Sequence, residues 1–334
     1  MYGQHASPLR HTVRHLVTGG AGFIGSHLID RLMADPDNHV ICLDNYLSGC
    51  RRNVVQWQQH QRFELLRHDS IEPVRLEVDQ IWHLACPASP RIYQRNPIAT
   101  AKTCVLGTLN MLGLARRCGA RMLLASTSEV YGDPQLTPQS ETYLGNVNCT
   151  GPRACYDEGK RLAETLCFDY ERLHGVAITV ARIFNTYGPR MASSDGRVVT
   201  NFIGQALTGQ PLTVYGKGSQ TRSFCFVSDL VRGLLALMNS QVEGPINLGN
   251  PVEITVMDLA ERIIRLVNPA LGVVYEPLPV DDPQRRCPLI KQAEELLAWK
   301  PMISLDQGLQ ATIDAMAIEL AAAHSMEPVG PLMP

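Results

Sequence analysis

The stretch that decides the fold is Val13-Arg14-His15-Leu16-Val17-Thr18, followed by Gly19-Gly20-Ala21-Gly22-Phe23-Ile24-Gly25. The first six residues predict a short apolar β-strand, and the amphipathic run 26–33 after the glycines predicts a helix. Gly19, Gly22 and Gly25 therefore stand as G-x-x-G-x-x-G between a strand and a helix. Without side chains there, the backbone can turn sharply and approach a pyrophosphate, whose charge meets the amides of the helix N-terminus. The segment predicts a dinucleotide-binding turn.

An acidic residue at the end of the second predicted strand specifies the dinucleotide. The run 39–43 ends in Asp44, 19 positions after Gly25. A carboxylate there can accept hydrogen bonds from both ribose hydroxyls of NAD and would repel the extra phosphate of NADP. Tight helix packing alone would explain the glycines but not this residue. The predicted NAD-binding residues are Gly19, Gly22, Phe23, Ile24, Gly25, Asp44, Asn45, Ser48, Gly49, Asp69, Leu84, Ala85, Thr103, Tyr156 and Lys160.

Further apolar runs alternate with helical patterns. Predicted strands lie at 63–67, 80–84, 121–125 and 177–183, and long helical patterns at 97–118 and 155–173. Such alternation predicts an α/β fold with a doubly wound parallel Rossmann sheet, which binds ligands at the carboxyl ends of its strands. After residue 185 turn signals accumulate and the elements shorten. We expect a Rossmann domain at 13–185, with segments near 223–250 returning to it. A smaller C-terminal α/β substrate lobe is expected at 186–222 and 251–317, with tails at 1–12 and 324–334.

Composition excludes several classes of function. The 334 residues are 45% hydrophobic and 19% charged, and the net charge is −2. This balance gives no reason to expect a nucleic-acid or anionic-membrane partner. The ten cysteines are scattered rather than set at the CxxC spacing of a metal site, so we expect reduced thiols and no metal. Before Arg14 there is neither an apolar signal core nor a stretch long enough to cross a bilayer, so we expect a cytoplasmic protein.

A phenol and an ammonium share one face of the second long helix. Tyr156 and Lys160 lie four residues apart. A nearby positive charge, helped by an oxidised nicotinamide ring, predicts a lowered pKa for Tyr156. The tyrosine could then take a proton from a sugar hydroxyl while hydride leaves the same carbon. YxxxK alone is common on surface helices. Its position after a strand that ends in Ser126-Thr127-Ser128-Glu129 favours catalysis.

Taken together, these motifs resemble those of the extended short-chain dehydrogenases/reductases, over residues 13–315. The last motif is Arg182-Ile183-Phe184-Asn185-Thr186-Tyr187-Gly188-Pro189. Longer strings are similar to UDP-glucuronate decarboxylases, namely CPASP at 86–90, ASTSEVYG at 125–132, GPRACYDEGK at 151–160, IFNTYGPRM at 183–191, DGRVV at 195–199 and GKGSQTRSF at 216–224.

The resemblance implies roles for individual residues. Thr127 would help to hold the sugar C4 hydroxyl, Tyr156 would be the base, and Lys160 would bind the nicotinamide ribose. Ser128, Glu129 and Arg286 would form the decarboxylation set. The implied substrate-binding residues are Tyr93, Lys102, Asn110, Arg116, Asn185, Tyr215, Arg222 and Arg286. In similar enzymes the helices at 97–118 and 155–173 pair across a two-fold axis, which implies a homodimer through a four-helix bundle.

The implied reaction converts UDP-glucuronate to UDP-xylose and CO2. Oxidation at C4 would place the carboxylate β to a ketone, so that CO2 could leave, and NAD would be restored in each cycle. The alternatives are another NAD-dependent nucleotide-sugar 4-epimerase or 4,6-dehydratase, or an NAD sensor without catalysis. A dehydratase is expected to carry Asp-Glu after the strand-five threonine, where this chain has Ser128-Glu129. A sensor would not need Thr127, Tyr156 and Lys160 together.

Overall fold

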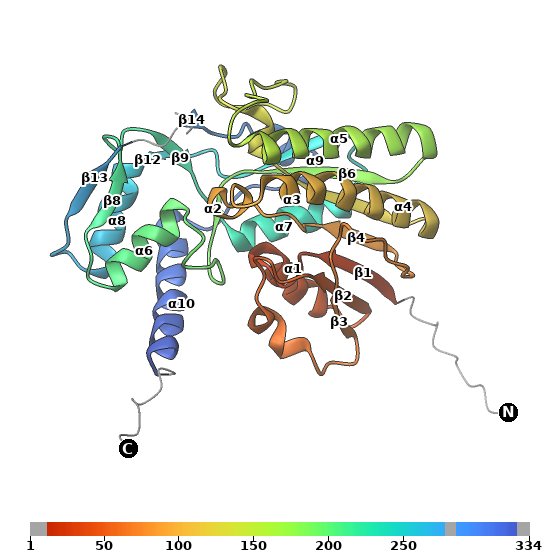
Figure 1. Cartoon of the computed structure of the whole chain (residues 1–334), viewed down its shortest axis with the longest axis horizontal. Coiled ribbons are helices and arrows are strands. Elements are labelled where there is room, and N and C mark those ends of the chain that lie inside the picture. The colour runs from red at the N-terminus through yellow and green to blue at the C-terminus, as the bar shows by residue number, and fades with distance from the viewer. Residues whose placement is uncertain (1–11, 278–284, 326–334) are drawn as a thin grey trace.

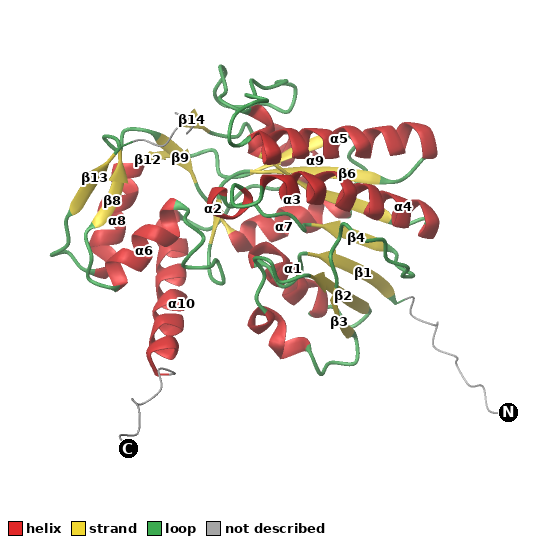
Figure 2. Ribbon diagram, in the orientation of Figure 1, coloured by secondary structure: helices red, strands yellow, loops and turns green. Residues whose placement is uncertain are grey.

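A seven-stranded sheet forms the centre of the computed structural model, which describes residues 12–277 and 285–325 (Figures 1 and 2). Its order is β11-β6-β5-β4-β1-β2-β3, and every neighbouring pair is parallel. The strands are β1 (Val13–Thr18), β2 (Asn38–Asp44), β3 (Phe63–Arg67), β4 (Gln80–His83), β5 (Arg121–Thr127), β6 (Ile178–Ile183) and β11 (Pro245–Leu248). The order reverses between β1 and β4, where such sheets bind ligands. The predicted doubly wound Rossmann sheet is confirmed.

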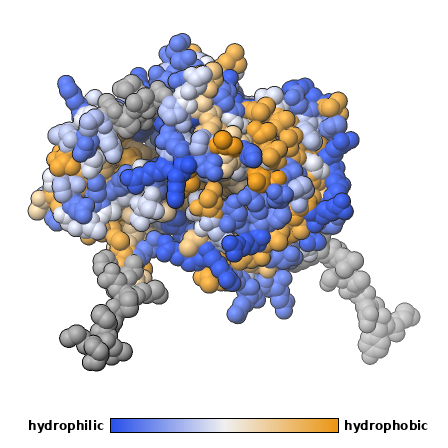
Figure 3. Space-filling view, in the orientation of Figure 1, coloured by the Kyte–Doolittle hydropathy of each residue, from blue (hydrophilic) through white to orange (hydrophobic). Residues whose placement is uncertain are grey.

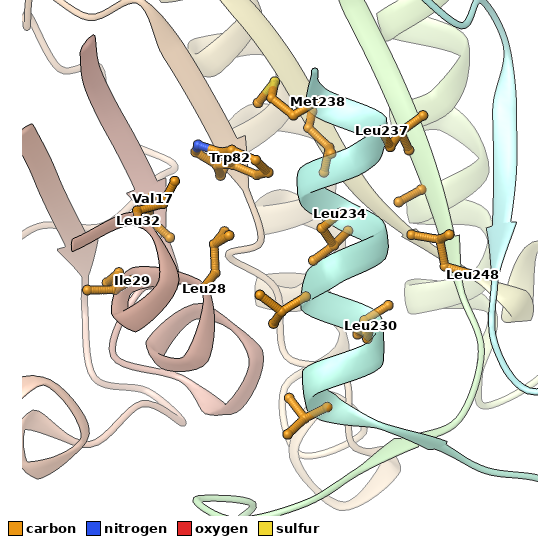
Figure 4. Close-up of a cluster of buried hydrophobic side chains, with 14 of the residues drawn as sticks. Val17, Leu28, Ile29, Leu32, Trp82, Leu230, Leu234, Leu237, Met238 and Leu248 are labelled. Carbon is orange, nitrogen blue, oxygen red and sulfur yellow. The ribbon is translucent and has the colours of Figure 1, made fainter. Parts of the chain in front are cut away.

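Helices cover both faces of this sheet because its strands are apolar on both sides. Along β1, Leu16 packs into the core on one face and Val17 into the core on the other. On the Leu16 face lie α4 (Thr108–Cys118) and α5 (Ala154–His174). On the Val17 face lie α1 (Phe23–Met33) and α7 (Val227–Met238). Figure 4 shows the second core, where Leu28 of α1 and Trp82 of β4 lie on one side of α7 and Leu248 of β11 lies on the other.

The long helical pattern at 97–118 forms one continuous run of three pieces. It consists of α3 (Pro97–Lys102), a π-helical stretch (Thr103–Gly107) and α4. By length and composition alone, Pro97–Cys118 could cross a membrane. In this fold the run lies on the flank of the sheet, where α4 contributes Met111 and Leu112 to the core. Within the run, 44% of the most apolar stretch is buried. Packing on the sheet and on α5 accounts for the buried part of its apolar surface.

A smaller lobe is built mainly from the second half of the chain. Its helices are α6 (Val198–Leu207), α8 (Val256–Val267) and α10 (Leu305–Ser325), which pack around a core that includes Phe202, Leu259 and Leu309. Its strands form three small sheets, β10-β7, β12-β9-β14 and β13-β8. They are β7 (Thr186–Tyr187), β8 (Leu212–Tyr215), β9 (Thr221–Ser223), β10 (Cys225–Phe226), β12 (Glu253–Thr255), β13 (Val273–Glu276) and β14 (Arg285–Arg286).

The chain returns to the main sheet more often than the sequence indicates. Helix α7 packs on the main sheet, and β11 is its edge strand beside β6. In addition, α9 (Lys291–Leu297) packs against β11 and α7, although it falls inside the range 251–317 assigned to the lobe. Trp299, which follows α9, is buried in the core on the α7 face and donates a hydrogen bond to the Asp229 carbonyl at 2.9 Å. Of the predicted tails, residues 1–11 and 326–334 lie outside the described residues.

Leu234 gives a test of this packing. It is fully buried between α7 and the sheet. We expect Leu234→Ala to lower the free energy of unfolding by about 2–5 kcal/mol, because it leaves a cavity in a close-packed core. Denaturant titration followed by circular dichroism measures this change. Leu144→Ala is the matched control, since Leu144 is 85% exposed and should change stability by less than about 0.5 kcal/mol. Equal losses in the two variants would contradict the packing.

Candidate active site

One cavity of about 740 Å³ lies at the carboxyl ends of the parallel strands. The Rossmann part contributes the glycine turn after β1, the end of β5 and the start of α5, whereas the lobe contributes residues of α6, β8 and β9. Two short helical segments also border it, the turn Arg51–Trp57 and α2 (Pro90–Tyr93). The cavity therefore spans both parts of the chain, as expected for a site that holds two ligands side by side.

The glycine turn is shaped by close backbone approaches. Gly19 has φ +69, and a Cβ on it would lie 3.0 Å from the backbone of Ala85. A Cβ on Gly25 would lie 2.2 Å from the Gly19 carbonyl oxygen. Gly22 is the N-cap residue of α1 and offers no side-chain cap, and Gly22, Phe23, Ile24 and Gly25 line the cavity. These uncapped amides fit a pyrophosphate.

Asp44 lies where the adenosine ribose of NAD would be held. Its Oδ1 accepts a hydrogen bond from the Tyr46 amide at 2.7 Å and its Oδ2 one from the Ala21 amide at 2.9 Å. Burial raises the pKa of Asp44, and these two bonds oppose that shift. A Cβ on Gly49 would lie 2.8 Å from either carboxylate oxygen, so the loop closes tightly on the group. The residues fit an NAD ribose.

The other predicted NAD residues fall mostly at this cavity. Asn45, Ser48, Leu84, Ala85, Thr103, Tyr156 and Lys160 line it. Gly49 and Asp69 are not among the lining residues. Asp69 contributes indirectly, because its Oδ2 accepts a hydrogen bond from Asn45 Nδ2 at 2.9 Å.

Thr127, Tyr156 and Lys160 meet at the end of β5. Thr127 is the last residue of β5, and its side chain lies close enough to Tyr156 to oppose the rise in the Tyr156 pKa. The Tyr156 ring stacks on Tyr93 of α2, with centroids 5.1 Å apart and planes 1° apart. Lys160 Nζ donates to the Ala125 carbonyl at 2.8 Å and lies 6.0 Å from the Tyr156 ring centroid. All three side chains line the cavity.

The expected lowering of the Tyr156 pKa is not found in the chain by itself. Burial raises this pKa well above its ordinary value, and the Thr127 side chain only opposes that rise. The Lys160 ammonium is held by a backbone carbonyl rather than by the phenol oxygen. Helical spacing did not predict this Lys160 contact, because it sets which face a residue occupies but not where a flexible ammonium points. The lowered pKa of Tyr156 next to an oxidised nicotinamide ring stays a prediction.

Glu129 is held between two arginines. It lies in the 3₁₀ turn Ser128–Tyr131 after β5. Arg286 of β14 donates from Nη1 to Oε1 at 2.6 Å and from Nη2 to Oε2 at 3.1 Å. Arg153 Nη2 lies 2.8 and 2.7 Å from the same two oxygens. Burial alone raises the pKa of Glu129, but the two guanidinium groups outweigh it and hold that pKa at about 2. Glu129 is thus ionised at neutral pH.

The predicted substrate residues lie at the cavity, directly behind it, or away from it. Those at the cavity are Asn185, Tyr215, Arg222 and Arg286, together with Ser128 and Glu129 of the decarboxylation set. Tyr93 lies behind Tyr156 as its stacking partner. The remaining three are Lys102, Asn110 and Arg116, and none of them lines the cavity.

The position of Arg116 disagrees most clearly with its predicted role in substrate binding. It is exposed in the last turn of α4, just before the start of β5, and so lies at the opposite edge of the sheet. Lys102 is exposed on α3. Asn110 Nδ2 donates to the Ser70 carbonyl at 3.0 Å, which is a structural contact. We no longer assign these three residues to the substrate of this chain. The resemblance placed them on a helix, whereas the fold decides which end of that helix meets the ligand.

Sequence reasoning missed several residues that line the cavity. Arg153 lies at the start of α5 and was visible within GPRACYDEGK, but no role was drawn for it. Ser89 Oγ donates to the Asp195 carbonyl at 2.5 Å and so joins the loop after β4 to the lobe. Cys86 Sγ lies 3.3 Å from Cys104 Sγ beside Tyr156. Within residues 12–277 and 285–325, no group of three or more His, Cys, Asp and Glu could hold a metal ion.

Comparison of this chain with known proteins shows the family to which it belongs. Residues 15–249 match the NAD dependent epimerase/dehydratase family. The chain belongs to this family. Among its members, UDP-glucuronic acid decarboxylase 5 of Arabidopsis thaliana is 58% identical over 309 residues, 91% of each chain. UDP-glucuronic acid decarboxylase 1 of Danio rerio is 58% identical over 307 residues, which are 92% of this chain and 73% of the relative.

Solved structures of the family share the fold at lower identity. UDP-glucose 4-epimerase of Thermotoga maritima, solved with UDP-glucose, is 28% identical with a TM-score of 0.85, covering 92% of this chain and 100% of that one. UDP-glucuronic acid 4-epimerase of Bacillus cereus, solved with UDP-glucuronic acid and NAD, is 26% identical with a TM-score of 0.83 over the same shares. As a member of the family, this chain uses NAD as its cofactor.

The glycine turn predicts a selective loss of NAD binding. We expect Gly25→Ala to weaken NAD at least about tenfold, since its Cβ would press on the Gly19 carbonyl and move the amides that face the pyrophosphate. Isothermal titration calorimetry measures the affinity. Gly113→Ala is the matched control, because Gly113 lies in α4 with open space around the added carbon. Unchanged NAD affinity in Gly25→Ala would contradict this account of the turn.

Proposed function

We propose that this member of the family decarboxylates UDP-glucuronate to UDP-xylose and CO2. The observation that carries the proposal is a proton-transfer set, Thr127 with Tyr156, in one cavity with the carboxylate-handling pair Glu129 and Arg286. The first set serves oxidation and reduction at a sugar hydroxyl, and the second serves an acidic substituent. Relatives at 58% identity that are UDP-glucuronic acid decarboxylases support the same reading.

NAD fits between the glycine turn and Tyr156. Gly22 to Gly25 would hold its pyrophosphate and Asp44 its adenosine ribose, while Lys160 lies where the nicotinamide ribose is expected. When bound, NAD supplies the reversible hydride acceptor for C4 of the sugar, which places the carboxylate β to a ketone and lets CO2 leave. Because the hydride returns to the sugar, we expect no net NADH.

Tyr156 moves the proton in this scheme. Its side chain is buried at the end of β5 beside Thr127, so the pair can hold the sugar C4 oxygen. The phenolate form of Tyr156, which a bound oxidised nicotinamide ring would favour over the buried phenol, takes the C4 hydroxyl proton. As CO2 leaves, negative charge develops on that oxygen. The protonated Tyr156 and Thr127 are then placed as donors, and a donor of this kind is worth about 3–4 kcal/mol. The same proton returns when the ketone is reduced.

Arg286 offers a planar fork for the acidic end of the substrate. Its side chain is buried at the cavity wall, and it lies beside Arg222 in the register of β14 with β9. Two-point binding of a carboxylate is the strength of a guanidinium group. Arg222 also lines the cavity, and the resemblance assigns it to the diphosphate. In our proposal Glu129 orients the carboxylate end, and C5 gains its proton from water after CO2 leaves, next to the ionised Glu129.

The runner-up function is 4-epimerisation of UDP-glucuronate. It needs the same C4 oxidation but keeps the carboxylate, and a solved neighbour has this activity in its name. The second alternative, a 4,6-dehydratase, is represented by dTDP-glucose 4,6-dehydratase of Streptomyces venezuelae, which is 25% identical with a TM-score of 0.84. Both remain outcomes of one product assay.

Product analysis with a Tyr156 variant tests the proposal. We expect the purified chain with NAD and UDP-glucuronate to release CO2 and UDP-xylose, resolved by chromatography. Tyr156→Phe keeps the ring that stacks on Tyr93 but removes the hydroxyl, so we expect turnover to fall by about 10²–10⁴-fold. Tyr170→Phe, on the same helix outside the cavity, should keep wild-type turnover. UDP-galacturonate as product would establish the epimerase instead, and no conversion would leave an NAD-binding protein without this activity.

We also propose a homodimer formed through a four-helix bundle. Large apolar side chains are exposed along the outer flank of the Rossmann part, and Figure 3 shows hydrophobic atoms gathered over the area of α3, α4 and α5. They are Ile98, Leu106, Leu162 and Leu173. Two copies that paired α4 and α5 around a two-fold axis would cover this surface. Cytoplasmic residence is a further proposal, supported by the ten free thiols.

Sedimentation tests the dimer. We expect the wild-type chain to sediment at twice its mass of 36.9 kDa and Leu162→Glu at the monomer mass, because a charge would be buried in the bundle. Leu144→Glu places the same charge at an exposed leucine on the loop after β5 and should leave the mass unchanged. A wild-type monomer at micromolar concentration would refute the proposed assembly.

A further inference from the structure

We propose that Arg153 is a positioning residue that keeps Glu129 in place when the substrate carboxylate takes over the guanidinium fork of Arg286. The inference rests on the proposed decarboxylation and adds a residue to it. It starts from an occupied binding site, because the arginine best placed for the substrate already has a carboxylate partner within the chain.

Glu129 occupies the end of the Arg286 guanidinium group, where the two terminal nitrogens form a fork. Both terminal nitrogens contact Glu129, at 2.6 and 3.1 Å, and the residue is 5% exposed. Its remaining donor, Nε, is buried without a hydrogen-bond partner among the described residues. Because Nε is buried, a substrate carboxylate that binds both terminal nitrogens of Arg286 end-on must displace Glu129 from them or share them with it. If Glu129 were displaced and had no other partner, its buried carboxylate would be left without a counter-charge.

Arg153 prevents that loss because it approaches Glu129 from another element. A single nitrogen, Nη2, lies 2.8 and 2.7 Å from both Glu129 oxygens. Arg153 stands at the N-cap of α5, whereas Arg286 belongs to β14. When Arg286 turns to the substrate, Glu129 keeps a charged partner and its place in the cavity. Removing one partner of a buried ion pair is costly, and a second partner avoids this cost.

Arg153 also links the two halves of the chemistry. Its backbone carbonyl accepts hydrogen bonds from the amides of Tyr156 and Asp157 at 3.0 and 3.1 Å, in the first turn of α5. Its side chain holds Glu129, which follows Thr127 by two residues. The group that handles the carboxylate is thereby fixed to the same turn that presents Tyr156. A shift of Glu129 would misplace the carboxylate end of the substrate relative to Tyr156.

The charges around Glu129 determine what a variant will show. Facing it are Arg286 from β14, Arg153, Tyr156 and Asp157 from α5, and Tyr93 from α2. Loss of Arg153 removes one of the two cations that hold the Glu129 pKa at about 2, so this pKa rises. Protonation of Glu129 then occurs at higher pH than in the wild type, and activity that needs the carboxylate falls on the acid side.

The experiment compares Arg153→Met, Arg153→Lys and the wild type over pH 5 to 9, with NAD and UDP-glucuronate. For Arg153→Met we expect kcat to fall at least about tenfold, with a smaller change in KM, and a new acid limb in kcat. Arg153→Lys keeps the charge and should recover most of the wild-type pH profile. Arg161→Met is the matched control. It also lies on α5, and its Nη1 donates to the Val130 and Leu144 carbonyls at 2.9 and 2.8 Å without touching Glu129.

Two additions keep the outcome unambiguous. Burial, and secondly the charge of Glu129, raise the pKa of Asp157 to about 7, so the comparison is repeated in an Asp157→Asn background to remove that titration. Circular dichroism and NAD affinity report on folding. Should Arg153→Met not fold, Arg153→Gln takes its place with the same expectation.

Three results would overturn the inference. If Arg153→Met shows the same kcat and pH profile as the wild type, the inference alone fails. Arg161→Met could show the same acid limb, which would reduce Arg153 to a structural tie of α5. Finally, a wild-type chain that releases no CO2 from UDP-glucuronate would remove the proposed function and this inference with it. The wild-type assay, run in parallel, distinguishes the last case from the first two.

Discussion

The fold and the site depend on one close approach, where the first turn of α1 crosses the end of β1. Only hydrogen fits on the Gly25 α-carbon there, since a Cβ would lie 2.2 Å from the Gly19 carbonyl. The contact aims the α1 amides into the cavity and sets the first strand–helix unit against the sheet. Because the strand order reverses beside β1, the same point fixes where the other strand ends gather. Thr127 and Asp44 both reach the cavity for this reason.

Local sequence patterns were sufficient for the Rossmann part. The predicted strand at 63–67 coincides with β3, and Val13–Thr18 with β1, because buried parallel strands are short apolar runs that end at polar residues. The return of α9 to the main sheet could not be read in this way. Its placement depends on Trp299 filling a gap beside α7 and finding a carbonyl acceptor at Asp229, which is a tertiary contact without a local signal. Periodicity reports which face is apolar, not which core will receive it.

The site residues likewise fall into those that a local motif predicts and those that depend on the fold. Glycine spacing, the acidic end of β2 and the Tyr156–Lys160 pair could be predicted, since each is a short motif tied to one turn or helix face. Arg116 was misplaced because a resemblance carries a residue along the chain without saying which edge of the sheet it meets. The pKa of Tyr156 also required the fold, because burial decides its direction. Arg153 became visible only when its guanidinium was seen beside Glu129.

The charge balance around Glu129 bears on which sugar the cavity accepts. Two guanidinium groups face one ionised carboxylate, so the cluster carries an excess positive charge in a buried position. Asp157, the other carboxyl nearby, supplies only part of a counter-charge, because burial and then the Glu129 charge raise its pKa to about 7. A neutral hexose would bring no negative charge of its own to this cluster. A hexuronic acid brings one negative charge to the same place, so binding is favoured for the acid and disfavoured for the neutral sugar by the same electrostatics. Selectivity for the acidic sugar thus comes from the groups that later release its carboxylate.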